Sequence, residues 1–545
     1  MSILNFWPFK KSPPRKTQVE VLKWIESLPA DKKYIICEIP VGGGKSPIAL
    51  NVSAWMDNVN STNTSITGNN PSVGNSFILT PQKILQKQYE DSFPDMAYSF
   101  YGKSNYQCSM KGTNCEIGNL VKPVCKPCCH KAAYEEALAS RNLVMNYTLA
   151  ITYKLTPADL MKKRKLMVFD ECHNIEKQLI DLFGVYISQK SCARYVCNYR
   201  KPKNLLDAHN FIATEYTNAI VSFIANQQIA VDEILHKMSA GKNPSKTEMM
   251  LIDELEKAKK HLMMVNLLMD KPKDEFVAEH VLIEHPESFE IKELYARNIF
   301  SSFFDDTAHR FLFMSSTILD KDEFCSDLGI DPSQTAFISM PSEFDVDNRL
   351  VIFNPVAKMT YGWDSKEREP DRKAMIKALK TICKDLHASD NGVVHTGSYQ
   401  VSNWLVRELQ GHIPHRIYHH NSDAEEARGQ VIENFMTDDH KGPKILISPS
   451  VTEGLDLKDD LGRFSVIAKT PYPYLGDAWV KRRSEISQKW YMLQAMKSII
   501  QASGRVVRNK EDWGTTYILD ESFASLYSRM KRYIPKWWDD AFERM

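Results

Sequence analysis

The sequence predicts an α/β protein built on parallel β-sheets. Apolar runs such as Leu166–Asp170 and Lys444–Ser448 end abruptly in charged or small polar residues, and amphipathic segments follow them. Short continuous apolar runs are typical of strands that are buried on both faces, as in parallel sheets. Ligands bind such sheets at the carboxyl ends of their strands, so the residues that follow these runs are the first candidates for a functional site.

Length and composition restrict the class of protein. The chain has 545 residues, which predicts about three or four domains rather than one core. Its net charge is only +1, so any nucleic-acid-binding surface has to be local. No apolar run approaches the roughly 18 residues of a membrane span. The opening segment, Met1–Phe9, lacks the charge order of a signal peptide. We therefore expect a protein of the cytoplasm (nucleoid-associated) or the nucleus, neither secreted nor membrane-bound.

A phosphate-binding loop is predicted near the N-terminus. The strand-like run Tyr34–Ile39 leads into the glycine-rich turn Pro40–Ser46, and a helical stretch follows. Glycines let backbone N–H groups approach phosphate, while Lys45 would reach the β- and γ-phosphates and the Ser46 hydroxyl would bind Mg²⁺. The strict G-x-x-x-x-G-K-S/T pattern fails at its first position, which is Ile39. The candidate nucleotide-binding residues of this turn are Gly42, Gly44, Lys45 and Ser46.

A carboxylate pair, Asp170-Glu171, ends the apolar run that begins at Leu166. One carboxylate can bind Mg²⁺ while its neighbour polarises a water for attack on a phosphate. An isolated pair is more often an acidic start of a helix. Together with the glycine-rich turn it predicts a shared site, because Mg²⁺ has to bridge Ser46 and Asp170 around one nucleotide.

Two further features fit the same chemistry. The Gln18 amide is able to recognise the edge of a base such as adenine, although a single glutamine is more often a surface residue. Arg505 and Arg508 are three residues apart on a predicted helix over Gln501–Arg508, so they share a face. Paired guanidinium groups suit a γ-phosphate, but an exposed salt-bridged face is the commoner reason for such a pair.

A cysteine cluster predicts a metal centre. Its members are Cys108, Cys115, Cys125, Cys128 and Cys129. Four thiolates suffice for one metal site, so one cysteine is spare; we expect Cys128 as the fourth ligand, with Cys129 as the alternative. The residue chemistry alone leaves Zn²⁺ and an iron–sulfur cluster open, and base rates favour zinc.

The remaining segments complete the domain plan. Residues 57–76 are rich in Asn and Ser and predict a mobile surface loop. Residues 190–300 predict long amphipathic helices, in which the methionine-rich stretch Met263–Met269 is expected in the core. A strand over Arg310–Thr317 and a second α/β half after about residue 345 follow.

Seven blocks, taken together, resemble the superfamily 2 helicases, and specifically the iron–sulfur family that includes XPD and DinG. The blocks that resemble motifs I, Ia, II, III, IV, V and VI are, in order, Pro40–Ser46, Thr80–Gln88, Asp170–His173, Ser315–Thr317, Gly397–Tyr399, Glu453–Asp456 and Gln501–Arg508. The resemblance spans the chain from Gln18 to Trp537-Trp538. The family's usual residues around the fourth cysteine ligand are replaced here by Cys128-Cys129-His130.

The resemblance implies two RecA-like parallel-sheet domains, the first carrying two insertions. The implied segments are 1–105, 141–189 and 301–344 for the first domain, 106–140 for a cysteine-rich Fe–S domain, 190–300 for a helical arch, and 345–545 for the second domain. It also reverses the preference for zinc, so that a 4Fe–4S cluster becomes the expected metal centre and Zn²⁺ the alternative.

The resemblance implies an ATP-dependent DNA helicase that moves 5′ to 3′ on single-stranded DNA and opens fork or tailed duplexes in repair, replication or recombination. Lys45, Asp170, Glu171, Gln501, Arg505 and Arg508 would be catalytic, and Gln18, Gly454 and Asp456 would join the nucleotide-binding residues. The alternatives are a translocase or DNA–RNA hybrid remodeller, and an ATP-switched scaffold subunit. We expect a monomer.

Overall fold

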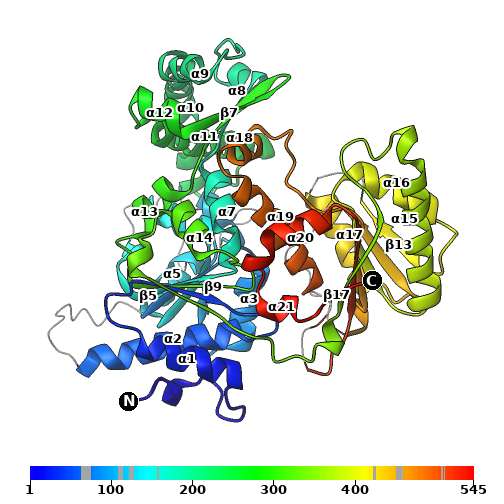
Figure 1. The fold of residues 1–545 in the computed structure, drawn as a ribbon. Coiled ribbons are helices and arrows are strands. Elements are labelled where there is room, and N and C mark those ends of the chain that lie inside the picture. The colour runs from blue at the N-terminus through cyan, green and yellow to red at the C-terminus, as the bar shows by residue number, and fades with distance from the viewer. Residues whose placement is uncertain are drawn as a thin grey trace.

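Two seven-stranded parallel sheets and one small antiparallel sheet organise the computed structural model (Figure 1). The structure describes residues 1–62, 75–108, 114–118, 120–121, 128–155, 159–420, 425–449, 457, 459–504, 507 and 510–545. The predicted fold class, α/β with two parallel-sheet domains, is confirmed.

The first sheet has the strand order β10-β1-β9-β5-β2-β4-β3. Its strands are β1 (Tyr34–Glu38), β2 (Ser76–Thr80), β3 (Tyr98–Ser99), β4 (Asn142–Asn146), β5 (Arg164–Asp170), β9 (Ala308–Ser315) and β10 (Thr335–Ser339). The helices around it are α1 (Lys16–Ser27), α2 (Lys45–Thr62), α3 (Lys83–Ser92), α5 (Cys129–Ala139), α6 (Tyr147–Lys154), α7 (Ile175–Phe183), α13 (Arg297–Phe304) and α14 (Lys321–Leu328).

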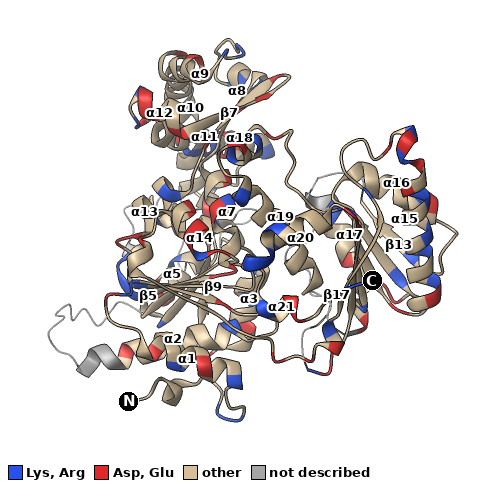
Figure 2. Ribbon diagram, viewed as in Figure 1, with Lys and Arg blue, Asp and Glu red and all other residues tan. Residues whose placement is uncertain are grey.

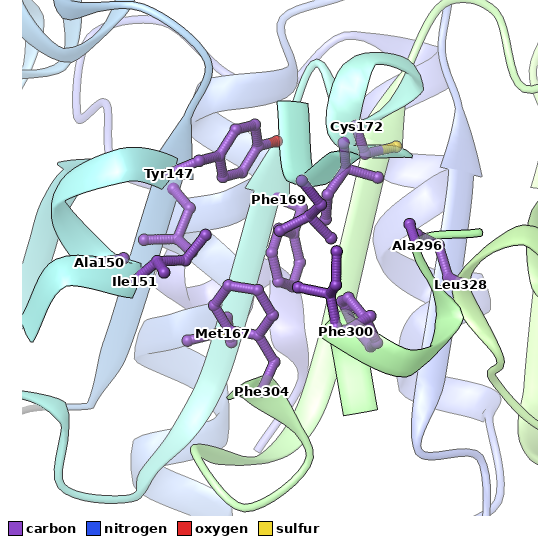
Figure 3. Packing of buried hydrophobic residues seen from close by; sticks show 14 of the residues in the cluster. Tyr147, Ala150, Ile151, Met167, Phe169, Cys172, Ala296, Phe300, Phe304 and Leu328 are labelled. Carbon is purple, nitrogen blue, oxygen red and sulfur yellow. The ribbon is translucent and has the colours of Figure 1, made fainter. Parts of the chain in front are cut away.

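Alternate residues of each strand enter cores on opposite faces of this sheet. On one face Phe169 stacks on Phe313 with ring centroids 4.9 Å apart. Phe300 and Phe304 also pack against Phe169 (Figure 3). The neighbouring Val168 belongs to the core of the other face, which α1 and α2 cover. Strands buried on both faces explain why the sequence shows continuous apolar runs rather than alternation.

The second sheet has the order β13-β14-β12-β15-β16-β11-β17. Its strands are β11 (Val351–Ala357), β12 (Gly392–His395), β13 (Arg416–His419), β14 (Lys444–Ser448), β15 (Phe464–Ile467), β16 (Thr515–Asp520) and β17 (Phe542–Arg544). Helices α15 (Glu369–Thr381) and α16 (Tyr399–Leu409) cover one face, the face turned away from the first domain in Figure 1. The other helices are α17 (Glu425–Thr437), α18 (Ala478–Ile486), α19 (Gln488–Ser503), α20 (Phe523–Met530) and α21 (Lys536–Asp539).

A helical region rises from the first domain at the top of Figure 1. Its helices are α8 (Gln189–Arg194), α9 (Leu205–Phe211), α10 (Thr217–Ser239), α11 (Lys246–Met269) and α12 (Lys273–Glu279). It also contains an antiparallel sheet of β6 (Val185–Ser188), β8 (Ser288–Glu293) and β7 (His280–His285), which was not predicted from the sequence. Val185, Ile187, Phe289 and Ile291 fill buried positions of this sheet. Apolar residues in strands this short are easily taken for part of a helical pattern.

Helix α18 and the start of α19 cross from the second half of the chain to the first domain. Trp479 and Trp490 are part of the first domain's core, and the Trp479 indole N–H donates to the backbone oxygen of Glu293 at 2.9 Å. Arg483, 2% exposed, donates to Glu176 at 2.9 Å and to Asp327 at 2.6 Å. This end of α19 is therefore fixed to the first domain, whereas its later residues pack in the second.

Two sequence predictions need correction. Helix α2 extends to Thr62, so the predicted loop over 57–76 does not begin at Asp57, whose carboxylate instead pairs with Lys165 at 2.7 Å. Helix α19 ends at Ser503 with Gly504 as its cap, so the helix predicted over Gln501–Arg508 is shorter than expected.

In the part of the chain that the structure describes, no helix is long and apolar enough to cross a lipid bilayer.

Candidate active site

The glycine-rich turn joins the carboxyl end of β1 to the start of α2. Gly42 and Gly44 both have φ of +73°, a conformation that favours glycine. A Cβ atom on Gly44 would lie 2.2 Å from Nε2 of Gln18. Both the backbone conformation and the close approach therefore require glycine at position 44.

Gln18 holds this turn from the side of α1. Its Nε2 donates to the backbone oxygens of Gly43 and Gly44 at 3.2 and 3.3 Å, and its Oε1 accepts from the N–H of Arg15 at 2.8 Å. The side chain is only 3% exposed. The structure thus gives Gln18 a contact with the turn that the sequence did not predict, and its recognition of a base stays a prediction.

Asp170 ends β5 in a buried position. Its carboxylate accepts from the Tyr89 hydroxyl at 2.9 Å and from the Glu171 N–H at 3.0 Å. Burial, reinforced by the neighbouring Glu171, raises the pKa of Asp170 to about 6. Tyr89 was not among the predicted site residues. The Ser46 hydroxyl also hydrogen-bonds Tyr89, so this tyrosine links the two predicted Mg²⁺ ligands.

Glu171 lies beside Lys45 in a backbone conformation that is unusual for a side chain of its size. Its φ is +50°, in the left-handed region, and its Oε1 lies 2.9 Å from Nζ of Lys45. Strained residues of this kind cluster at functional sites. His173 Nδ1 lies 3.4 Å from the other Glu171 oxygen and 2.8 Å from Ser315 Oγ, which connects the carboxylates to the end of β9.

The second half of the chain reaches the same place through Gln501 on α19. Its Nε2 donates to Thr317 Oγ1 at 2.8 Å. A pocket of about 350 Å³ lies between these elements. Among the residues that line it are Gly44, Lys45, Ser46, Asp170, Glu171 and Gln501. The structure therefore brings together predicted residues from three separated sequence blocks. The strands β1 and β5 both neighbour β9 in the sheet, and α19 brings Gln501 to Thr317, just after β9.

Five predicted site residues fall outside the described residues. They are Cys125, Gly454, Asp456, Arg505 and Arg508. Their roles stay predictions.

Three of the predicted cysteine ligands lie together. Cys108, Cys115 and Cys128 form one buried cluster against Tyr106, whereas Cys129 is exposed. A Cβ on Gly118 would lie 2.4 Å from the Cys108 sulfur, so the chain passes very close to this thiol. Within the described residues no three side chains are arranged to hold a metal ion. The donor chemistry of three gathered thiols nevertheless suits a thiolate-bound metal whose remaining ligand would be Cys125.

Two family models match the chain. Residues 11–208 match the model described as type III restriction enzyme, res subunit, and residues 380–541 match the helicase C-terminal domain. Together they cover well over half of the chain.

Curated relatives match over a short segment. The regulator of telomere elongation helicase 1 homolog of Caenorhabditis elegans is 33% identical over 110 aligned positions, which cover 17% of this chain and 11% of that protein. The homolog of Culex quinquefasciatus is 36% identical over 100 positions, which cover 16% of this chain and 10% of that protein. The match thus spans about a tenth of the length of these relatives.

Solved structures match over nearly the whole chain. An XPD helicase structure aligns with 97% of this chain and 99% of its own at a TM-score of 0.61 and 16% identity. The structure of S. tokodaii Xpd4 aligns with 97% of this chain and 100% of its own, at a TM-score of 0.56 and 14% identity. At this level of identity the likeness establishes a shared fold.

Proposed function

We propose that the chain, which matches a helicase C-terminal domain model and shares the fold of XPD helicase structures, is an ATP-dependent DNA helicase of superfamily 2 and of the XPD/DinG type. One observation carries the proposal: Lys45, Glu171 and Gln501 line one pocket, although they come from the start, the middle and the end of the chain. Such a pocket changes shape when the two sheets move, which is how hydrolysis would be coupled to motion.

ATP would bind with its phosphates on the glycine-rich turn. Lys45 would exchange its contact with Glu171 for the phosphates, and Ser46 and Asp170 would hold Mg²⁺, which supplies positive charge to the phosphate oxygens. Glu171, released from Lys45, would orient the attacking water, with His173 fixing its other oxygen. Gln501, Arg505 and Arg508 would approach from the second domain, the arginines stabilising charge on the transferring phosphoryl group.

The proposed polymer is single-stranded DNA, gripped through its phosphates and by stacking of its bases. We propose 5′-to-3′ movement and opening of tailed or forked duplexes. A translocase or a DNA–RNA hybrid remodeller uses the same site and is the second candidate; a scaffold that binds ATP without turnover is the third. The compartment, cytoplasm or nucleus, and the monomeric state stay predictions.

The cysteine cluster is proposed to hold a 4Fe–4S cluster, with Zn²⁺ as the alternative. Cys108, Cys115 and Cys128 would be ligands with Cys125, and the exposure of Cys129 supports Cys128 as the ligand of that pair. The segment beside it, with Ile117, Leu120 and Val121, packs against α10 and α11. A metal there would order the contact between this insertion and the helical region.

The decisive experiment is strand separation by anaerobically purified protein with Mg²⁺ and ATP. The substrates are partial duplexes with a 5′ or a 3′ single-stranded tail, in DNA and in DNA–RNA form. Opening of only 5′-tailed substrates supports the proposal, whereas DNA-stimulated hydrolysis without opening supports the translocase. ATPase activity that is negligible and independent of DNA supports the scaffold.

The site assignment is tested by Lys45→Ala, with Lys23→Ala, an exposed lysine on α1, as the control. We expect Lys45→Ala to abolish hydrolysis without changing the thermal midpoint by more than the control does. Normal turnover by Lys45→Ala would refute the assignment.

A further inference from the structure

Two adjoining hollows lie on the outer face of the second domain, far from the candidate ATP pocket. They measure about 760 and 510 Å³ and share Arg372 of α15 and Trp404 of α16 in their linings. The two hollows therefore adjoin at these side chains, and we call them together the α15–α16 groove.

Lysines follow one side of this groove. Lys373, Lys377, Lys380 and Lys384 recur every three or four residues along α15 and the short π-helix after it, and all four line the groove. Figure 2 shows several blue Lys or Arg positions along α15. This spacing places them on one face of the helix, about 5 Å apart along its axis. Met375 and Leu379, fully buried, mark the opposite, core-facing side. The lysines thus form a row of positive charge and not scattered surface positions.

Most of this charge is not neutralised within the described chain. Lys373 pairs with Glu369 at 2.7 Å, but the described residues offer no ion pair to Lys377, Lys380 or Lys384. The carboxylates of the lining include Asp385 and Glu408, so the surplus of positive charge is modest. A surface of this kind binds a polyanion weakly and with a strong dependence on salt.

An aromatic pair forms the floor of the groove. Trp404 is partly exposed and lies against Trp363 with ring centroids 5.1 Å apart. Arg372 is fixed beside them, because its Nη1 donates to the backbone oxygens of Trp363 and Ser365 at 2.8 and 2.7 Å. A supported indole next to cations offers a stacking surface for nucleic acid bases, which acidic peptides lack.

The groove begins at the carboxyl edge of the second sheet. Gln400, Asn403 and His419 line its first part, and Gln400 directly follows Tyr399 at the start of α16. This is the sheet edge where ligands bind α/β domains, so a strand held there would run into the groove without a break.

We propose that the α15–α16 groove is an accessory site for single-stranded DNA, with the lysine row contacting phosphates and Trp404 stacking on a base. The site extends the strand's path from the sheet edge to the outer flank of the second domain. The choice of DNA as the polymer rests on the proposed function. The groove would lengthen the bound segment without taking part in ATP hydrolysis.

The test uses full-length, nucleotide-free protein and labelled oligothymidine of about 10 and 30 nucleotides. The variant is Lys377→Gln/Lys380→Gln/Lys384→Gln, and the matched control is Lys10→Gln/Lys11→Gln/Lys23→Gln, three exposed lysines of the first domain. Binding of the long oligonucleotide should weaken about tenfold in the variant only. For this variant, the slope of the logarithm of the binding constant against the logarithm of the salt concentration should become shallower by about 2. Each lost phosphate contact reduces that slope by about 0.7, and the variant removes three lysines. An unchanged slope would overturn the proposal.

A second readout separates this proposal from the helicase assignment. ATPase stimulation by the short oligonucleotide should be unchanged in the groove variant, and Trp404→Phe should retain long-oligonucleotide binding that Trp404→Ala loses. If no DNA stimulates hydrolysis but the variant still loses long-strand binding, the groove stands and the helicase assignment fails. Tighter binding of polyglutamate than of oligothymidine to the same lysines would assign the groove to an acidic peptide and overturn the DNA site.

Discussion

Arg483 of α18 and Glu176 of α7 form a buried ion pair, 2.9 Å long, between the two halves of the chain. Glu176 lies in the first turn of the helix that follows Asp170 and Glu171, and Arg483 also contacts Asp327 at 2.6 Å. One guanidinium thus connects the helix behind the candidate catalytic carboxylates to the helix that leads to Gln501. The two elements cannot shift independently while this pair is intact.

Replacing Arg483 should destabilise the protein strongly. Arg483→Met leaves the Glu176 carboxylate buried without its cation, which costs about 3–5 kcal/mol. We expect a clear drop in the thermal midpoint and a larger loss of ATPase activity in Arg483→Met than in Arg483→Lys. Arg482→Met, its exposed neighbour, is the control and should behave as wild type. A midpoint unchanged by Arg483→Met would show that the pair contributes nothing.

The same cluster should make stability depend on pH. Burial, reinforced by Glu176, raises the pKa of Asp327 to about 8 despite the nearby Arg483. A carboxyl whose pKa is higher in the folded than in the unfolded protein stabilises the fold while it is protonated, so stability falls as pH rises through about 8.

Asp327→Asn should remove this pH-dependent decrease in the free energy of unfolding, which amounts to about 1 kcal/mol between pH 7 and 9. The measurement is the thermal midpoint of wild type and variant at both pH values, with Asp322→Asn, an exposed carboxylate of the same helix, as the control. An equal drop in wild type and Asp327→Asn would disprove the assignment of this pH dependence to Asp327.

Tyr89 should tune the Mg²⁺ site. Tyr89→Phe removes the hydroxyl that donates to Asp170 without creating a large cavity. Groups that orient metal ligands typically change metal affinity by about 10–100-fold. We expect the Mg²⁺ concentration for half-maximal ATPase to rise about tenfold, with little change in the maximal rate. Tyr147→Phe is a useful comparison, since the Tyr147 hydroxyl donates to the backbone oxygen of Asp170 and not to its carboxylate.

Gly44→Ala should be more damaging than conformational strain alone predicts. Both Gly44 and Gly241 have positive φ, but only at Gly44 would a Cβ meet another group, Nε2 of Gln18 at 2.2 Å. Gly241→Ala should therefore lower the free energy of unfolding by about 1 kcal/mol or more. Gly44→Ala should in addition displace Gln18 and abolish nucleotide binding. Nucleotide binding by fluorescence titration and the thermal midpoint, measured on both variants, separate the two effects.

The cysteine ligands can be distinguished by metal content. Cys115→Ser should lose the metal and unwinding while ATP binding remains, because the cluster lies apart from the pocket residues. Cys128→Ser should do the same, whereas Cys129→Ser, at the exposed neighbour, should retain wild-type iron. If Cys128→Ser retained iron and Cys129→Ser lost it, Cys129 would be the ligand and Cys128 the spare cysteine.

The sequence predicted only some strands of the two parallel sheets, namely those that are continuous apolar runs, such as Leu166–Asp170 and Lys444–Ser448, which match β5 and β14. It did not predict β6, β7 and β8, whose few residues resemble the surrounding helical pattern. Nor did it predict Arg483 as a connection between the halves. A lone arginine in an amphipathic helix has no local signal of burial, since its partners Glu176 and Asp327 are distant in sequence.

The pocket was predicted through Lys45, Ser46, Asp170 and Glu171 because their chemistry depends on local order: a turn after a strand, and carboxylates after another. Tyr89 and His173 were not given roles. Each acts through a hydrogen bond to a residue in another element, and only the packed sheet shows which tyrosine or histidine faces inward.

The position of β1 in the first sheet has a consequence for the order in which the chain can fold. Tyr34 pairs on one side with Phe311 of β9 and on the other with Thr335 of β10, so this strand stays unpaired on both edges until the ribosome has made most of the first domain. Long-range pairing of this kind slows folding and leaves strand edges open to aggregation. During synthesis, the segment that carries the phosphate-binding turn would emerge well before β9 and β10 and could be paired only after both have followed it.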